Sequence, residues 1–204
     1  MSDRPIQHDP MTAVATGLAS AVLGASARIA STGRVGPREE RLFRALNDRP
    51  GSFGVLAWSV MQSGSLGAVG VVAVGLAGRG RRSDALVTAV SSTGLWTGVK
   101  AIKPLIGRGR PDHHLADVVV RGRPQRGLGY PSGHSAVSAS LAVVLGRGTP
   151  PAVRVVLAGM ATMTGVTRMR VGAHLPADVA GGLSLGILWG LVLGRTIAVG
   201  RPDR

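Results

Sequence analysis

Long uncharged stretches alternate with short basic ones along this chain of 204 residues. The clearest uncharged stretch runs from Phe53 to Gly78, where 26 consecutive residues carry no charged side chain. A helix that rises about 1.5 Å per residue needs roughly 20 residues to cross the hydrocarbon core of a bilayer. This stretch is therefore long enough to span, even with a bend at Ser63-Gly64-Ser65. A second stretch, from Ala85 to Ile102, is rich in small and hydroxyl residues that favour close packing between helices.

Further apolar runs follow toward the C-terminus, at residues 135–146, 152–167 and 179–199. Together with the first two they predict five transmembrane helices. Residues 11–30 are also apolar, but they hold so many Ala, Gly and Ser that a sixth span and an interfacial helix are equally open. A cleaved signal peptide is not favoured there, because the charged segment that should precede it is weak. The fold class predicted is an all-α, polytopic membrane helical bundle.

The charged stretch at residues 34–50 separates the N-terminal run from the rest of the chain. Its apolar residues fall on one helical face, which predicts an amphipathic helix at the membrane surface. The chain is therefore expected to divide into a tail with a marginal apolar helix, an interfacial segment, a membrane-embedded domain and a short C-terminal tail, at residues 1–33, 34–52, 53–200 and 201–204.

Composition narrows the classes of function. The formal net charge is +14, which in a soluble chain would suggest a nucleic-acid partner. Aromatic residues make up only 3% of the chain, too few for base stacking, and no nucleic-acid motif is present, so no such partner is expected. The chain has no cysteine, which excludes disulfides, a thiol nucleophile and thiolate metal sites.

Three separated segments carry the candidate chemistry. They are KPLIGRGRP at 103–111, PSGH at 131–134 and TRMRVGAHLPAD at 167–178. Counting the predicted spans puts all three on the same side of the membrane. The positive-inside tendency assigns the Arg79–Arg82 turn, Arg147 and the C-terminus to the cytoplasm and the three segments to the extracytoplasmic face. The opposite orientation stays open, because the loop between the first two segments is itself basic.

A cluster of cations is what a phosphoryl group requires. During transfer its negative charge spreads over three oxygens, so fixed positive donors stabilise it. Lys103, Arg110 and Arg168 fit that need, since arginine suits bidentate contact with phosphate and lysine acts as a point charge. Arg108 is interpreted instead as a loop charge that meets solvent or lipid headgroups.

The second segment precedes an apolar helix. Ser132 is therefore expected at its N-cap, and the free N–H groups of Gly133 and its neighbours are expected to point at an anion. Glycine lets the backbone approach a phosphate closely. His134 would lie in the first turn, beside the same oxyanion, where it could serve as general acid.

The third segment pairs a histidine with a carboxylate. Pro176 is a natural first-turn residue, which places His174 just before a helix and Asp178 in its first turns. A carboxylate there can orient the imidazole and stabilise the cation that forms when its other nitrogen attacks. His113 and His114, with Asp112 and Asp117, lack a convincing ligand geometry and are interpreted as loop residues, so no metal site and no cofactor are expected.

These residues resemble the type 2 phosphatidic acid phosphatases, a family related to the vanadium haloperoxidases and the bacterial acid phosphatases. The family signature is Lys-x6-Arg-Pro, Pro-Ser-Gly-His and Ser-Arg-x5-His-x3-Asp. The chain carries all three parts, with Thr167 in place of the usual serine. The resemblance implies His174 as nucleophile, His134 as general acid and base and Asp178 as the residue that orients His174. It also implies that phosphate is held by Lys103, Arg110, Ser132, Gly133 and Arg168.

The resemblance and the apolar stretches together predict a multi-pass protein of the cell membrane, active in lipid metabolism or cell-wall synthesis. The expected activity is hydrolysis of a lipid-linked phosphate through a phosphohistidine. Phosphatidate, phosphatidylglycerophosphate, a prenyl pyrophosphate and decaprenylphosphoryl phosphoribose all remain candidate substrates. Two other functions stay open on the same scaffold, a vanadate-dependent peroxidase and a non-catalytic lipid-binding or transport protein.

Overall fold

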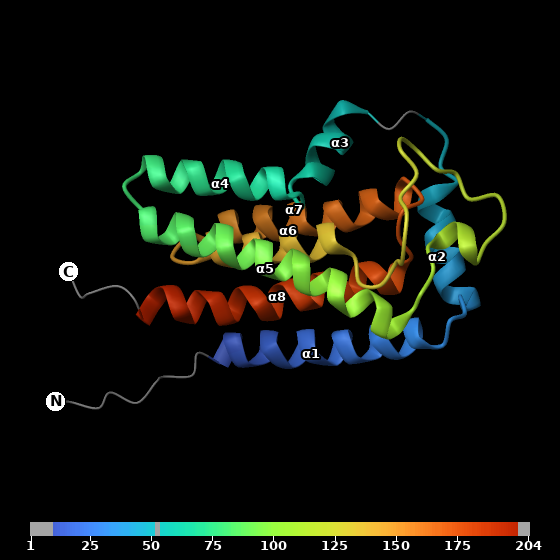
Figure 1. Ribbon diagram of the computed structural model, residues 1–204, viewed down its shortest axis with the longest axis horizontal. Helices are drawn as coiled ribbons and strands as arrows, with labels where there is room; N and C mark the ends of the chain where they lie inside the picture. The colour runs from blue at the N-terminus through green and yellow to red at the C-terminus, as the bar shows by residue number, and fades with distance from the viewer. Residues whose placement is uncertain (1–9, 52–53, 200–204) are drawn as a thin grey trace.

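The computed structural model describes residues 10–51 and 54–199, and within them all the regular structure is helical (Figure 1). The tails predicted at the two ends lie largely outside the described residues, as does Phe53. The elements in chain order are α1 (Pro10–Ser31), α2 (Pro37–Asn47), α3 (Val55–Gln62), α4 (Leu66–Gly78), α5 (Arg82–Ile106), the single 3₁₀ turn η1 (Pro111–His113), α6 (Gly133–Gly146), α7 (Pro151–Arg170) and α8 (Pro176–Val199).

The long helices run side by side, and the short elements gather at one end (Figure 1). Helices α6 and α8 make the most extensive contact, α1 lies along α8, α7 packs on α6, and α4 packs on α5. Helices α2 and α3 and the long loop from 107 to 132 lie at the same end of the bundle, which we call the motif end (Figure 1). The α4–α5 and α6–α7 turns lie at the opposite end, which we call the far end.

Small residues bring α6 and α8 together. Gly182, Gly186 and Gly190 recur every four residues, so they share one face of α8. A Cβ atom on Gly182 would overlap the carbonyl of Ser132, and one on Gly186 would overlap that of Ala136. Backbone-to-backbone packing of this kind is typical of membrane helices, whose association relies on close van der Waals contact.

The predicted bend at Ser63-Gly64-Ser65 is confirmed, since α3 and α4 meet at 70°. Ser65 accepts a hydrogen bond from the N–H of Ala68 and so caps α4. The hydroxyl of Ser63 is in hydrogen-bond contact with that of Thr164, 2.9 Å away on α7. Gly64 lies against the backbone of His134, where a side chain would overlap it. The bend therefore docks on the start of α6.

Fewer helices are long and apolar enough to cross a membrane than the five or six expected. Among the described residues, two helices qualify as spans, Pro10–Ser31 and Pro176–Leu193, and the bent pair α3–α4 makes a third if it counts as one. Helix α6 has 14 residues, which at about 1.5 Å each cover only part of a bilayer core. Helices α5 and α7 extend past their apolar parts into charged ends. The count of five or six stays a prediction.

Helix α2 uses part of its apolar face for the bundle itself. Phe43 is fully buried against Met169, Leu175 and Val179, at the end of α7 and the start of α8. Asn47 donates to the carbonyl of Val119 and accepts from its N–H, both at 2.9 Å. The stretch expected to rest on the membrane surface is therefore anchored to protein and covers the motif end.

Candidate active site

The three motif segments converge on one cavity at the motif end. The cavity has a volume of about 290 Å³, and its wall includes six of the eight residues predicted from the sequence, namely Lys103, Arg110, Gly133, His134, Arg168 and His174. They come from the end of α5, the loop after it, the start of α6, the end of α7 and the loop before α8. The other two, Ser132 and Asp178, are fully buried and do not line it.

His174 and Asp178 lie where the sequence predicted, because α8 begins at Pro176. The Nδ1 atom of His174 is 3.5 Å from Oδ2 of Asp178, too long for a firm hydrogen bond. The same Oδ2 accepts the N–H of Leu175 at 3.0 Å, which fixes the carboxylate in the first turn of the helix. Burial lowers the pKa of His174 well below 6.5, and the charges of Arg168 and Lys103 act in the same direction. The imidazole is therefore neutral at pH 7.

Arg168 has the most unengaged donors of the three cations. Its side chain is buried, its Nη1 contacts the sulfur of Met61 at 3.5 Å, and its Nε has no hydrogen-bond partner in the described part of the chain. A buried guanidinium in this state is costly unless an anion supplies the missing contacts. The cavity beside it is thus suited to a phosphate.

Arg110 and Lys103 combine a charge with a structural task. Arg110 donates from Nη1 to the carbonyl of Ala173 at 2.7 Å, and burial lowers the pKa of its guanidinium, although an arginine stays protonated at pH 7. The ammonium of Lys103 donates to the carbonyls of Leu128, Gly129 and Pro131 at 2.8 to 3.0 Å. Because an ammonium has three N–H donors, Lys103 reaches the cavity as a positive charge that clamps the loop rather than as a free donor.

The start of α6 faces the cavity. Ser132 is its N-cap residue, as predicted, with an extended backbone, and its N–H donates to the carbonyl of Asp178 at 2.9 Å. Its hydroxyl makes no capping bond and instead accepts from the hydroxyl of Ser135 at 3.0 Å. Gly133 lines the cavity, and the first N–H groups of a helix have no partner within it. The anion-binding role expected here thus rests on backbone.

His134 is held by an aromatic neighbour. The ring of Trp96 meets it edge to face, with centroids 5.4 Å apart and planes at 70°. His134 also lines a second, larger cavity of about 420 Å³, together with Arg110 and Arg168. The two cavities therefore adjoin at the three side chains best placed to contact a phosphoryl group.

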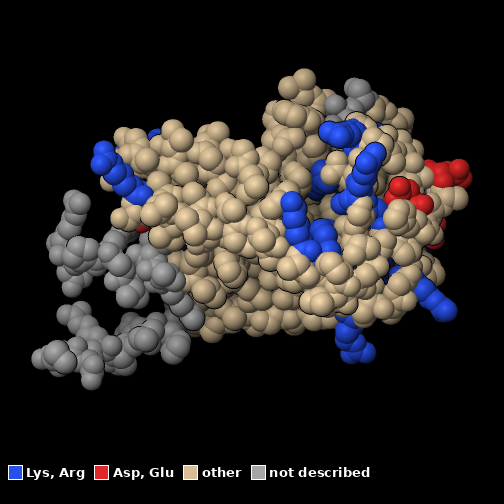
Figure 2. Space-filling model, viewed as in Figure 1, with Lys and Arg blue, Asp and Glu red and all other residues tan. Residues whose placement is uncertain are grey.

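The larger cavity has polar and apolar side chains in its wall. Its wall includes Trp58 and Gln62 of α3, and Arg123 and Gln125 of the loop. Figure 2 shows Lys and Arg side chains gathered around a hollow at the motif end. A group that continues from the phosphoryl group into this cavity would meet hydrogen-bond donors and an aromatic face.

Comparison with known proteins places the chain in a family. Residues 84–199 match the model of the PAP2 superfamily. This protein belongs to the PAP2 superfamily. The match spans all three motif segments, and it confirms the resemblance inferred from them.

Curated relatives of this PAP2 protein include two kinds of phosphatase. The decaprenylphosphoryl-5-phosphoribose phosphatase of Mycobacterium tuberculosis is 36% identical over 92 residues, which cover 45% of this chain and 49% of the relative. The lipid A 1-phosphatase of Rhizobium etli is 37% identical over 109 residues, which cover 50% and 44%. The chain therefore spans about half the length of the curated relatives it matches.

Solved structures share the fold. The Aquifex aeolicus LpxE structure has a TM-score of 0.68 at 25% identity, covering 75% of this chain and 92% of that one. A transmembrane PAP2 type phosphatidylglycerolphosphate phosphatase from Bacillus subtilis has a TM-score of 0.66 at 20% identity, covering 89% and 97%. With its apolar helices, this PAP2 protein is a membrane protein of all-α fold.

Two residues of the motif end were misjudged or missed from the sequence. Arg108 is not a solvated loop charge, since its side chain is fully buried and forms ion pairs with Glu39 and Asp178. Glu39 lies in α2, outside the part of the chain that matches the PAP2 model. No local pattern links the two, because 69 residues of sequence separate them.

Two other parts of the loop have a structural role. Arg121 donates to the carbonyls of Asn47 and Arg170 at 2.8 and 2.6 Å. His113 ends the 3₁₀ turn, and within residues 10–51 and 54–199 the His, Cys, Asp and Glu side chains form no group of three that could hold a metal ion.

Proposed function

We propose that this protein is a multi-pass membrane phosphatase that hydrolyses a lipid-linked phosphate monoester or pyrophosphate. The observation that carries the proposal is the cavity that joins two histidines to Lys103 and to the buried Arg110 and Arg168. A neutral buried imidazole beside unengaged guanidinium donors suits attack on an anionic phosphorus. The names of the matched relatives, all phosphatases of lipids or lipid-linked groups, support the same class of reaction.

The first step transfers the phosphoryl group to His174. Its Nε2 attacks phosphorus while the bond to the leaving oxygen breaks, and His134 gives that oxygen a proton. Burial and the charges of Arg168 and Arg110 lower the pKa of His134 to about 3 in the free protein, so His134 takes up this proton as the anionic phosphate of the substrate binds beside it. The imidazole becomes a phosphorylated cation, whose Nδ1–H is stabilised by the carboxylate of Asp178, 3.5 Å away in the free protein. The separation is expected to shorten as this charge develops.

The second step hydrolyses the phosphohistidine. His134, now neutral, takes a proton from water as the water oxygen attacks phosphorus and the P–N bond breaks. Inorganic phosphate leaves, His174 returns to its neutral form, and His134 is again protonated for the next turnover. Protons and electron pairs balance over the two steps without a metal ion or a redox partner.

The three cations divide the work of holding the phosphoryl oxygens. Arg168 offers direct donors, Arg110 adds a second guanidinium at the junction of the cavities, and Lys103 contributes charge. The first N–H groups of α6, at Gly133, supply neutral donors. Ser132 contributes by positioning this backbone, since its hydroxyl is turned to Ser135.

The substrate is proposed to lie with its headgroup in the two cavities and its lipid chain against the apolar helix faces. The larger cavity has a mixed lining, and its polar side chains, among them Gln62, Arg123 and Gln125, favour a substrate with hydrogen-bonding groups beyond the phosphorus. Phosphatidylglycerophosphate and decaprenylphosphoryl phosphoribose fit this better than phosphatidate or a prenyl pyrophosphate. The exposed arginines of the far end favour a cytoplasmic far end and an extracytoplasmic active site.

A panel of lipid phosphates tests the proposal. The purified full-length protein in detergent is expected to release phosphate from at least one of the four candidates in the presence of a chelator. His174→Ala should lower the rate by at least about a thousandfold, and His134→Ala should slow both steps. A His174→Ala protein that retains the wild-type rate would refute the phosphohistidine. Wild-type protein inactive on all four substrates would refute the phosphatase.

A further inference from the structure

A buried chain of charges runs behind the cavity, from α2 to His174. Glu39 pairs with Arg108, Arg108 faces Asp178, and Asp178 faces His174. The first pair is the closest, with Nη2 of Arg108 2.6 Å from Oε2 of Glu39 and Nη1 3.0 Å from Oε1. The next contact, from Nη1 of Arg108 to Oδ1 of Asp178, is 3.5 Å.

Burial makes these charges depend on one another. The side chains of Arg108 and Asp178 have no exposed surface, and that of Glu39 is 9% exposed. An unpaired charge in such a place is strongly unfavourable, so each group needs its neighbour. The one guanidinium lies between two carboxylates, which leaves the trio with a net negative charge on the side of His174.

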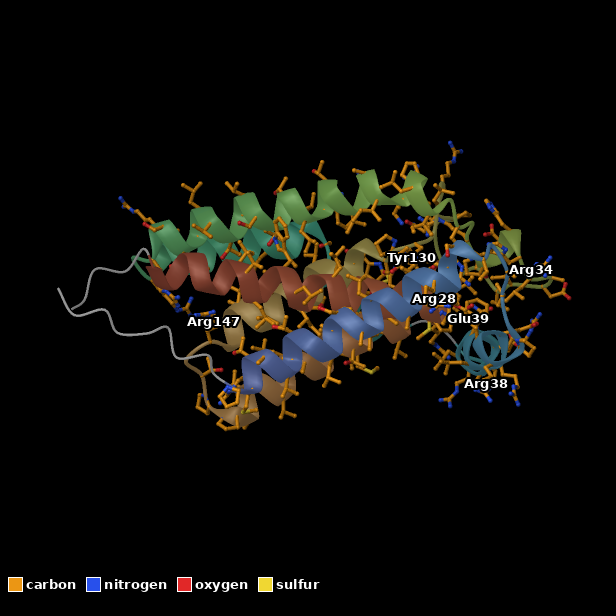
Figure 3. The ribbon with its side chains drawn as sticks, turned by 90° about the horizontal axis from the view of Figure 1, so that it is seen from below. Arg28, Arg34, Arg38, Glu39, Tyr130 and Arg147 are labelled. Carbon is orange, nitrogen blue, oxygen red and sulfur yellow. The ribbon has the colours of Figure 1, made fainter. Side chains whose placement is uncertain are left out.

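Glu39 also holds the helix that carries Asp178. Its Oε1 accepts the N–H of Ala177 at 2.9 Å, in the first turn of α8. A carboxylate at a helix N-terminus satisfies a free N–H and interacts favourably with the helix dipole. Figure 3 shows Glu39 on the side of α2 that faces the bundle, while its neighbour Arg38 points away.

The two oxygens of Asp178 face different partners. Oδ1 faces Arg108, and Oδ2 accepts the N–H of Leu175 and faces His174. A guanidinium free of other partners would bind such a carboxylate through two short contacts. Glu39 takes that two-point contact instead, which keeps Arg108 at the longer distance from Asp178.

We propose that Glu39 and Arg108 are positioning residues of the reaction: Glu39 restrains Arg108, so that Arg108 keeps Asp178 charged without drawing it away from His174. Neither residue contacts the cavity, and both act through Asp178. The inference rests on the proposed phosphatase function, in which Asp178 stabilises the cation formed at His174. Loss of Glu39 would let Arg108 compete with His174 for the carboxylate.

The test compares the same substitution at two neighbouring positions of α2. Glu39→Gln removes the buried charge, whereas Glu40→Gln removes a carboxylate whose pair with Arg44 is about one-third exposed. In the full-length protein, assayed on dioctanoyl phosphatidate or on whichever panel lipid the wild type hydrolyses, Glu39→Gln should lower kcat about tenfold to a hundredfold. KM should change less than about twofold, because the phosphate contacts are intact. Glu40→Gln should match the wild type.

A double variant measures the coupling. Arg108→Gln should also lower kcat. Glu39→Gln/Arg108→Gln should be no worse than Arg108→Gln alone, because glutamine keeps an oxygen that can accept the N–H of Ala177 and the charge of Glu39 acts through Arg108. A loss of kcat in the double variant equal to the product of the two single losses would show that Glu39 and Arg108 act independently, and would overturn the proposal. Glu39→Asp, which keeps the charge but shortens the reach, should lower kcat less than Glu39→Gln, and it decides the matter if the glutamine variant does not fold.

The outcomes separate this inference from the function on which it rests. Wild-type protein inactive on every lipid phosphate contradicts the phosphatase itself. An active wild type with Glu39→Gln within twofold of its kcat overturns the positioning role alone. A lower yield of folded Glu39→Gln protein whose kcat per folded molecule is unchanged overturns it as well, since a merely structural residue would behave in that way.

Discussion

Both ends of the helical bundle carry arginines, yet they hold them in opposite ways. At the motif end Arg108 and Arg168 are buried, 1% and 4% exposed; Arg108 pairs with carboxylates, and Arg168 faces the cavity and the sulfur of Met61. At the far end Arg79, Arg82 and Arg147 are exposed, and Figure 3 shows Arg147 well away from Glu39 and Tyr130. A buried arginine needs a specific partner, whereas an exposed one meets water or lipid headgroups.

The interior of the bundle and its outer faces also differ in the side chains they carry. Near the motif end, the core of α6 is rich in serine and alanine, and Ser138, Thr164 and Ser63 form a hydroxyl cluster with contacts of 2.9 to 3.2 Å. Large apolar side chains lie instead on the outer faces, among them Val71, Val74, Leu86, Val90, Val155 and Val156. The protein thus presents apolar surface to lipid and reserves polar packing for the site. Small polar residues therefore pack the interior near the site, and large apolar residues cover the outer faces.

The largest contrast is expected between two arginines of the same helix. Arg168→Met removes the guanidinium with unengaged donors and should lower activity about a hundredfold to a thousandfold, because the transferring phosphoryl group loses a fixed cation. Arg154→Met, on the exposed early part of α7, should leave kcat within about twofold. Phosphate-release kinetics of both variants measure the difference. Equal losses would erase the distinction between the two ends.

A smaller contrast is expected between two glycines. Gly64→Ala places a methyl group into the backbone of His134, so the bend or the start of α6 must shift, at a cost of about 1–3 kcal/mol. Gly78→Ala, at the far end of α4, has open space and should change stability by less than about 0.5 kcal/mol. Thermal unfolding in detergent tests both. A Gly64→Ala protein as stable as the wild type would mean that the docking is looser than the packing indicates.

The pH dependence of stability should report the buried imidazole. In the unfolded chain His174 gains a proton as pH falls through about 6.5, but in the folded protein burial keeps it neutral to a much lower pH. The unfolded state therefore binds more protons below that pH, and the free energy of unfolding falls by up to about 1.4 kcal/mol per pH unit. Above it, His174 adds no pH dependence.

The same measurement on His174→Gln isolates this group. Between about pH 5 and pH 6.5, the unfolding midpoint of the variant should fall less steeply with decreasing pH than that of the wild type. Parallel curves for the two proteins would show that the imidazole is not held neutral.

The smallest effect is expected at the surface pair of the far end. Nε of Arg81 lies 2.6 Å from Oδ2 of Asp84, but the Arg81 side chain is half exposed. Exposed pairs contribute roughly 0.2–1 kcal/mol, so Arg81→Gln should cost no more than that and leave activity unchanged. A loss of activity in Arg81→Gln would show that the far end contributes to the reaction, and would contradict the difference between the two ends.

Much of the site was predictable because its signals are local. A proline at the first turn of α8 places His174 and Asp178, and the motif Pro-Ser-Gly-His before an apolar run places Ser132 at a helix start. The bend at Gly64 followed from a Ser-Gly-Ser break in an apolar run. Each of these depends on residues only a few positions apart, and such spacing is visible in one sequence.

Other features needed the folded chain. The Gly182–Gly186–Gly190 face was overlooked as a helix contact, and the engagement of all three Lys103 donors by loop carbonyls has no local sign. The interpretation of Arg108 was wrong, since an arginine between two glycines looks like an exposed loop residue, and its pairing with Glu39 was missed. Burial is decided by what packs on a residue, and that partner came from a separate helix.

The sequence by itself determined the family, the apolar helices and the candidate reactive groups, because helix periodicity and motif spacing are short-range properties of a chain. Only the tertiary structure decided which charges are free to bind an anion and which are consumed in holding the site together. That division depends on distances between segments far apart in sequence. It leaves Arg168 open to the cavity and binds Arg108 between Glu39 and Asp178.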